Sequence, residues 1–150
     1  MSTRAVVKVI FGNAIVNIYK HHDGYIKNGF GEYLFNLIKD FNDRPLADDV
    51  NELVSTILKD KEETQITLYN HQDLSCLYTI EFEKNKAILK YYTIDYQKIL
   101  SFYNNDSESA FREYEKIMDN WQNNYRDYLK FLEVFDMKKI QEIIGNDEKK

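Results

Sequence analysis

Two short polar segments hold the residue types that could do chemistry in this chain. His21 and Asp23 stand in the segment YKHHDGY, and His71 and Asp73 stand in the segment NHQD. Two imidazoles and two carboxylates that converge would suit a divalent metal ion with open coordination positions. Alternatively, one histidine could act as a general base that an aspartate orients. The simpler interpretation is structural, because aspartate bonds turn amides and histidine caps backbone carbonyls. We therefore predict no catalytic residue, metal or cofactor, and keep these four residues as the alternative metal set.

A second pattern is a long aromatic stripe in the C-terminal third of the chain. Apolar residues recur at alternating spacings of three and four between residues 107 and 135, a heptad pattern typical of one helix. Most of these positions are aromatic, which suits docking on a sheet or a partner better than a simple coiled coil. The stripe consists of Phe111, Tyr114, Met118, Trp121, Tyr125, Tyr128, Leu132 and Phe135.

This stripe has two interpretations. It could pack on the sheet of its own domain, or it could form an intermolecular surface with tryptophan and tyrosine as anchors and asparagine as adaptable polar contacts. In the second case the predicted partner-binding residues are Tyr114, Trp121, Asn124, Tyr125 and Tyr128. A symmetric contact through the same helix would make the protein a homodimer; without it the protein is a monomer.

Hydrophobic periodicity predicts the elements that would position these residues. β-Branched residues flank a Gly12-Asn13 turn signal, which predicts an N-terminal hairpin. From Phe30 onward the period changes to that of a helix, for which Asn28 is a candidate N-cap. The expected elements are, in chain order, strands at 4–11 and 14–20, helices at 30–41 and 47–58, and strands at 64–70, 74–82 and 86–94.

This order predicts an α+β fold with a mostly antiparallel five-stranded sheet (β-β-α-α-β-β-β) and two helices on one face. The α+β domain would span residues 1–94. A helical extension over residues 95–150 would pack on it, starting with a short helix that Asp95 caps and ending with a helix at 137–144.

Composition narrows the classes of function. The chain has 150 residues, of which 43% are hydrophobic and 15% aromatic, so it can bury the core of one domain. Its single cysteine, Cys76, excludes an internal disulfide and a four-cysteine zinc site. A net charge of −5 argues against a protein that binds nucleic acid by neutralising phosphates, and permits a partner with a basic surface. Neither a leader peptide nor a membrane-spanning run is apparent, so we expect a cytoplasmic protein.

The first two thirds of the chain resembles a family of small phage and prophage proteins. Their shared pattern is an N-terminal TRA-type strand, Y-x-H-x-D-G-Y-P, a helix, D-V-x-x-L, and H-x-D-[LI]-x-Y-x-Y-x-I. The residues that match its two polar motifs are His21, Asp23, Gly24, Tyr25, His71, Asp73, Leu74 and Tyr78, while Ile26 replaces the proline. The resemblance implies a mobile-element origin and a fold, but it does not imply a particular reaction. It covers residues 2 to about 90, so the aromatic C-terminal segment lies outside the resemblance.

These features together predict a non-enzymatic phage or prophage protein that binds and inhibits a host protein by steric block. By analogy the target class is a bacterial defence nuclease, such as a CRISPR nuclease, because basic nucleic-acid channels attract acidic partners. The absence of Walker, GxGxxG and HExxH motifs agrees with a binding protein. Two alternatives stay open. One is a small metal-dependent hydrolase or nucleotide-binding enzyme that uses the His/Asp segments; the other is a structural oligomer through the C-terminal helix.

Overall fold

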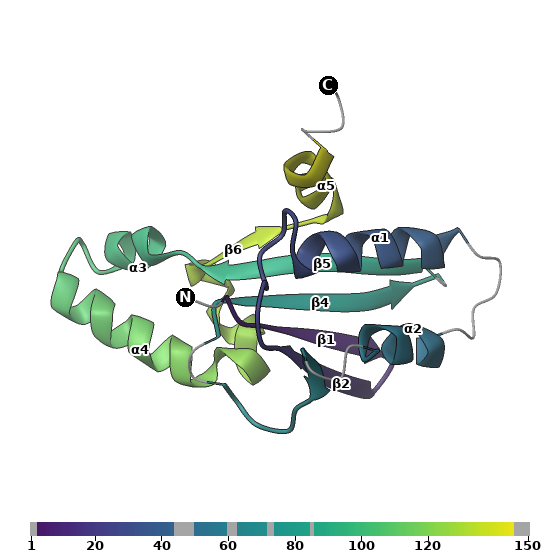
Figure 1. Ribbon diagram of the computed structural model, residues 1–150. Helices are drawn as coiled ribbons and strands as arrows, with labels where there is room; N and C mark the ends of the chain where they lie inside the picture. The colour runs from purple at the N-terminus through teal and green to yellow at the C-terminus, as the bar shows by residue number, and fades with distance from the viewer. Residues whose placement is uncertain (1–2, 44–49, 60–62, 72–73, 85, 146–150) are drawn as a thin grey trace.

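The computed structural model describes residues 3–43, 50–59, 63–71, 74–84 and 86–145. The strands are β1 (Ala5–Phe11), β2 (Ala14–Lys20), β3 (Thr64–Ile66), β4 (Cys76–Glu83), β5 (Lys86–Ile94) and β6 (Leu132–Phe135). The helices are α1 (Phe30–Asn42), α2 (Val50–Ile57), α3 (Tyr96–Phe102), α4 (Ser107–Asn124) and α5 (Met137–Gly145), with the 3-10 segment η1 (Tyr125–Phe131) after α4. Within these residues the strands form one sheet in the order β3-β2-β1-β4-β5-β6 (Figure 1). The predicted N-terminal residues 47–49 of the second helix lie outside the described residues.

The α+β class and the N-terminal hairpin are confirmed, but the sheet differs from the predicted one. β1 pairs antiparallel with β2, and Gly12 adopts a φ of 60° in the turn, a value that favours glycine. β1 also pairs with β4, and this pair is parallel. A parallel pair needs a long crossover, which the segment containing α1 and α2 provides. The sheet is therefore mixed and has six strands where the sequence predicted five.

The additional strand, β6, lies in the segment for which the heptad pattern predicted a helix. The prediction of a single helix over 107–135 is therefore wrong. α4 ends at Asn124, η1 follows, and Leu132–Phe135 pairs antiparallel with β5. The edge of β5 offers unpaired backbone groups, and their pairing with β6 satisfies them. Spacings of three and four also occur when successive short elements each bury aromatic side chains. The segment after residue 94 is consequently not purely helical, because it returns to the sheet through β6.

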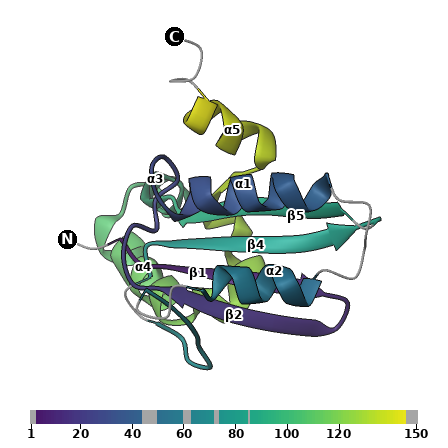
Figure 2. The ribbon, with the colours of Figure 1, turned by 45° about the vertical axis from the view of Figure 1, so that its right-hand side comes forward.

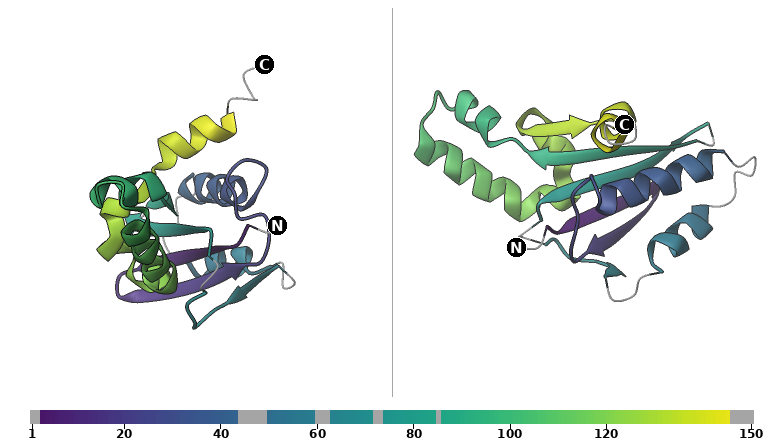
Figure 3. Two further views of the ribbon diagram at one scale, coloured as in Figure 1. Left: turned by 90° about the vertical axis from the view of Figure 1, so that its left-hand side faces the viewer. Right: turned by 45° about the horizontal axis from the view of Figure 1, so that its top comes forward.

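Helices cover both faces of the sheet, as the end-on view in Figure 3 shows. Alternation along β1 divides its side chains between two cores: Val7 and Val9 contact the face covered by α1, α2 and α5, and Val6 contacts the other face. α3, α4 and η1 supply the core of that second face. Figure 2 shows α1 and α2 on the near side of the strands and α4 behind them. The predicted packing of two helices on one face is thus confirmed, and α5 joins them there.

The helix starts agree only in part with the sequence. Asp95 caps α3 as predicted, since its side chain accepts hydrogen bonds from the backbone N–H groups of Gln97 and Lys98. Asn28 does not cap α1, because the N-cap residue is Gly29. A Cβ at Gly29 would collide with the carbonyl oxygen of Tyr25, so the close turn before α1 requires glycine at this position.

Tyr78 connects the turn before α1 to the sheet. Its buried hydroxyl donates a hydrogen bond to the Gly24 carbonyl oxygen at 2.6 Å, and the Cys76 thiol donates to the same oxygen at 3.2 Å. Burial raises the pKa of Tyr78 and raises the pKa of Cys76 to about 12, so both groups stay protonated as donors.

We expect Tyr78→Phe to lower the free energy of unfolding by about 1–2 kcal/mol, because the buried Gly24 carbonyl loses its shorter hydrogen bond. Urea denaturation measures this difference. Tyr25→Phe is the matched control, since the exposed Tyr25 hydroxyl donates to Asp23 Oδ1 at 2.8 Å. Equal losses of stability in both variants would contradict the role of Tyr78.

Candidate functional site

The structure brings the two motif histidines onto one tyrosine. The His71 ring stacks on Tyr19 with the centroids 3.8 Å apart, and His21 meets Tyr19 edge-on at 4.6 Å. The pKa of His71 is lowered, mainly by burial and then by the charges of His21 and Arg4. The ends of β2 and of the segment after β3 therefore do converge, as the metal interpretation required.

The other half of that predicted set does not complete a metal site in the described residues. Asp73 lies outside them. Asp23 accepts a hydrogen bond from the Tyr25 hydroxyl and lines a cavity to which neither His21 nor His71 belongs. His71 Nε2 lies within hydrogen-bond distance of Thr67 Oγ1, at 2.7 Å. No group of three or more His, Cys, Asp and Glu side chains with suitable geometry occurs among the residues that the structure describes.

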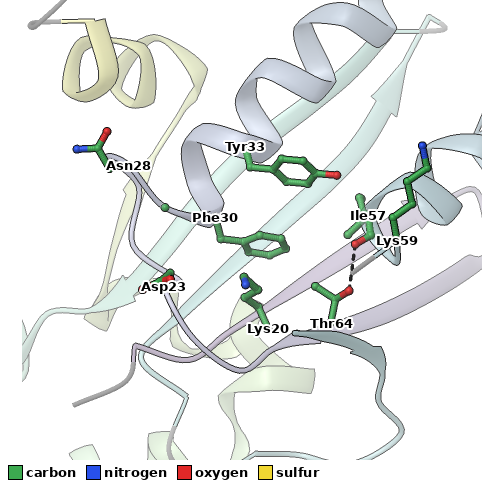
Figure 4. Close-up of a pocket in the computed structure, with 9 residues that line it drawn as sticks. Lys20, Asp23, Asn28, Phe30, Tyr33, Ile57, Lys59 and Thr64 are labelled. Carbon is green, nitrogen blue, oxygen red and sulfur yellow. Dashed lines mark hydrogen bonds between the residues drawn. The ribbon is translucent and has the colours of Figure 1, made fainter. Parts of the chain in front are cut away.

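The cavity beside Asp23 has a volume of about 320 Å³ and lies between the start of α1 and the ends of α2 and β2 (Figure 4). Two cationic side chains line it. Lys20 points toward the Phe30 ring and forms an ion pair with Glu63 at 3.0 Å, whereas Lys59 is exposed. Thr64 Oγ1 donates to the Ile57 carbonyl oxygen at 3.2 Å. Lys20 and Thr64 are therefore already bonded within the protein.

A buried glutamine holds the segment 67–71 against α4. Gln122 is 2% exposed, and its Oε1 accepts a hydrogen bond from the His71 backbone N–H at 2.7 Å. Its Nε2 donates to the Tyr69 carbonyl oxygen at 2.8 Å. Both ends of the carboxamide are used, which defines the position of this segment relative to α4.

Thr67 stabilises the same segment from within. Its backbone N–H donates to the Asn17 carbonyl oxygen of β2 at 2.9 Å, and its hydroxyl oxygen accepts from the Tyr69 N–H at 3.3 Å. The side chain of Thr67 is buried, as is that of Gln122. We call Thr67, His71 and Gln122 the polar clasp.

The outer side of the clasped segment is apolar and exposed. Leu68 is 86% exposed and Tyr69 is 76% exposed, and Ile66 at the end of the edge strand β3 is also exposed. We call these three residues the apolar ridge. In Figure 1 the segment after β3 runs along the lower margin of the molecule. Buried polar side chains thus hold large apolar side chains in solvent, an arrangement typical of a binding surface.

The predicted partner-binding residues are divided between core and surface. Trp121 is 0% exposed and packs, with the buried Tyr125, in the core between α4 and the sheet. These two side chains are therefore not available to a partner in this conformation. Tyr114 and Tyr128 are half-buried, and Asn124 is exposed. Binding through these three residues stays a prediction.

Sequence reasoning missed the ridge and the clasp. The sequence predicted a strand over 64–70, but β3 ends at Ile66. Consecutive side chains of a strand point to opposite faces of the sheet, so Leu68 and Tyr69 could not both have faced the core. Gln122 directly follows Trp121 but does not belong to the stripe, so the periodicity gave no signal that this glutamine is buried.

The lowered pKa of His71 in the polar clasp predicts that the free energy of unfolding depends on pH. The ordinary pKa of histidine is 6.5 and that of His71 in the folded protein is lower, so the unfolded chain binds the proton first as the pH falls. The contribution of neutral His71 is complete above pH 6.5 and decreases below it. We expect His71→Gln to reduce the slope of unfolding free energy against pH below about 6.5. Urea titrations at several pH values measure the slope, and an unchanged slope in His71→Gln would contradict this assignment.

None of the described helices combines the length and the apolar character that crossing a bilayer requires. No family model, no curated protein and no solved structure matches the chain.

Proposed function

We propose that the protein is a non-enzymatic binding protein of phage or prophage origin that docks on a host protein through the apolar ridge and inhibits it. The observation that carries this proposal is the exposure of Leu68 and Tyr69 on a segment that the polar clasp holds by hydrogen bonds. Exposure of these side chains does not stabilise the isolated fold, because the transfer of apolar surface out of water lowers the free energy. A partner that covers them recovers this free energy.

The clasp also lowers the cost of association. A surface loop that orders only on binding loses conformational entropy, whereas the segment 67–71 is already held by Gln122 and Thr67. Tyrosine is a frequent hot-spot residue because its large ring has few rotatable bonds. Tyr69 is therefore the proposed anchor, with Leu68 and Ile66 around it.

Charge supports the class of partner. The chain carries a net charge of −5, and the exposed Asp119 lies one helical turn before Gln122 on α4. An acidic protein is attracted to the basic channel of an enzyme that handles nucleic acid. The proposed target is a bacterial defence nuclease in the host cytoplasm, and the proposed mechanism is anti-CRISPR-like steric block of substrate entry or domain movement.

Phage challenge of a bacterial strain with an active CRISPR system tests this proposal. Expression of the protein should restore plaque formation by a targeted phage, and the purified protein should form a stoichiometric complex with the purified effector nuclease and stop DNA cleavage. Normal cleavage in the presence of excess protein, across the effector nucleases of the strain, would refute the target class. Sedimentation velocity of the protein alone is a second test, since a stable dimer would instead favour the alternative of a structural oligomer.

A further inference from the structure

A buried lysine lies on the second face of the sheet, whose core is supplied by α3, α4 and η1. Lys8 of β1 is 5% exposed, and its amine donates hydrogen bonds to Asn17 Oδ1 at 2.8 Å and to Asn123 Oδ1 at 3.3 Å. It lines a cavity of about 380 Å³ between the β1–β2 hairpin and the junction of α4 with η1. The other lining residues are Ile10, Gly12, Asn13, Ile15, Asn123, Asn124, Tyr125, Arg126 and Asp127.

The hydrogen bonds of Lys8 suit a neutral amine. A neutral amine has two N–H donors and one lone pair, and the two carboxamide oxygens accept both donors. A charged ammonium would have a third N–H without an acceptor from the described residues. Burial lowers the pKa of Lys8 to about 8, so a substantial fraction is neutral near physiological pH.

The charged groups around Lys8 leave its amine without a direct counter-ion. Arg126 and Asp127 come from η1, and Arg126 forms an ion pair with Glu81 of β4 at 3.5 Å. Lys90 of β5 belongs to the same face, because Lys8 and Lys90 both pair with Thr79 in the strand register. Among the described residues no carboxylate forms an ion pair with Lys8. Among the described residues, the charge on the amine is therefore stabilised only by the two carboxamide oxygens and by no carboxylate in direct contact.

We propose that Lys8 is a nucleophilic amine that forms an imine with a small 2-oxo acid in this cavity. The lone pair of Nζ attacks the carbonyl carbon to form the C–N bond while the C=O π bond opens onto the oxygen, and one N–H proton passes to that oxygen to give a carbinolamine. The hydroxyl group then leaves with the second N–H proton as water, and the nitrogen lone pair forms the C=N bond, with no change in oxidation state. The guanidinium of Arg126 and the carboxamide of Asn124 line the same cavity and are donors suited to the carboxylate.

Reductive trapping tests this proposal on the intact protein, independently of host binding. The protein is incubated with glyoxylate and cyanoborohydride at pH 7.5, and peptide mass spectrometry then locates the carboxymethyl groups. Because an ordinary lysine is almost fully charged at this pH, we expect Lys8 to be labelled about 10-fold faster than exposed lysines such as Lys59. Labelling of Lys8 at or below the rate of Lys59 would overturn the proposal.

A variant that keeps the amine provides the second test. Asn123→Asp places a carboxylate beside Lys8, which should raise its pKa and slow labelling at pH 7.5 by about 10-fold. Asn36→Asp adds the same charge at an exposed site on α1 and should leave labelling unchanged. Arg126→Gln should slow labelling by glyoxylate but not by the uncharged propionaldehyde. Equal labelling of wild type, Asn123→Asp and Asn36→Asp would overturn the assignment of Lys8 as the reactive amine.

Discussion

The double substitution Leu68→Ser and Tyr69→Ser is expected to weaken binding to the host target by about 1,000-fold, because truncation of hot-spot side chains costs about 2 kcal/mol each. The free energy of unfolding should change by less than about 0.5 kcal/mol, since both side chains are exposed and the clasp bonds only the backbone of Tyr69. Titration calorimetry with the purified effector nuclease measures the first quantity, and urea denaturation measures the second.

Phe111→Ser is the matched control for this prediction. Phe111 is an exposed aromatic residue on α4 that does not belong to the ridge. Its loss removes an exposed aromatic side chain from a different part of the surface, so affinity for the target should be retained. Equal losses of affinity in the ridge variant and in Phe111→Ser would show that general surface hydrophobicity, and not the ridge, is responsible.

Trp121→Ala is expected to lower the free energy of unfolding by about 3–5 kcal/mol, the usual cost of truncating a large buried aromatic side chain. Trp121 is fully buried between α4 and the sheet, together with Leu77 and Ile117. A domain of this size has a total stability of about 5–15 kcal/mol, so the variant should be partly unfolded at elevated temperature. Thermal and urea denaturation measure the loss.

Tyr128→Ala is the control for Trp121→Ala, because Tyr128 is half-buried in the same aromatic stripe and should cost less stability. The pair of variants also separates the two interpretations of the stripe. If Trp121→Ala kept the free energy of unfolding of the wild type but lost affinity for the target, Trp121 would be an interface anchor. That result would contradict the placement of Trp121 in the core. We expect the affinity per folded molecule to be unchanged.

Several elements were predictable because short-range patterns determine them. The Gly12 turn between two β-branched runs specifies the hairpin, and the apolar spacing after Phe30 specifies α1. The predicted strand at 86–94 has the observed bounds of β5. In each case the pattern of burial is set by neighbours within a few residues, so the sequence contains the required information locally.

Long-range packing decided the remainder. The parallel contact between β1 and β4 and the addition of β6 depend on which strand edges are free once the chain has folded back. The stripe from Phe111 to Phe135 has one period but falls on three successive elements, so periodicity could not show that Trp121 is buried.

The candidate sites show the same division. The sequence by itself offered convergence of the two histidine segments as an alternative to separate structural turns, and His21 and His71 do meet on Tyr19. Only the tertiary structure placed Gln122 against the segment 67–71 and Asn123 against Lys8, across sequence separations of 51 to 115 residues. Hydrogen bonds between residues so distant leave no periodic signal in a single sequence, because each partner satisfies its own local pattern and the bond exists only after the sheet has formed.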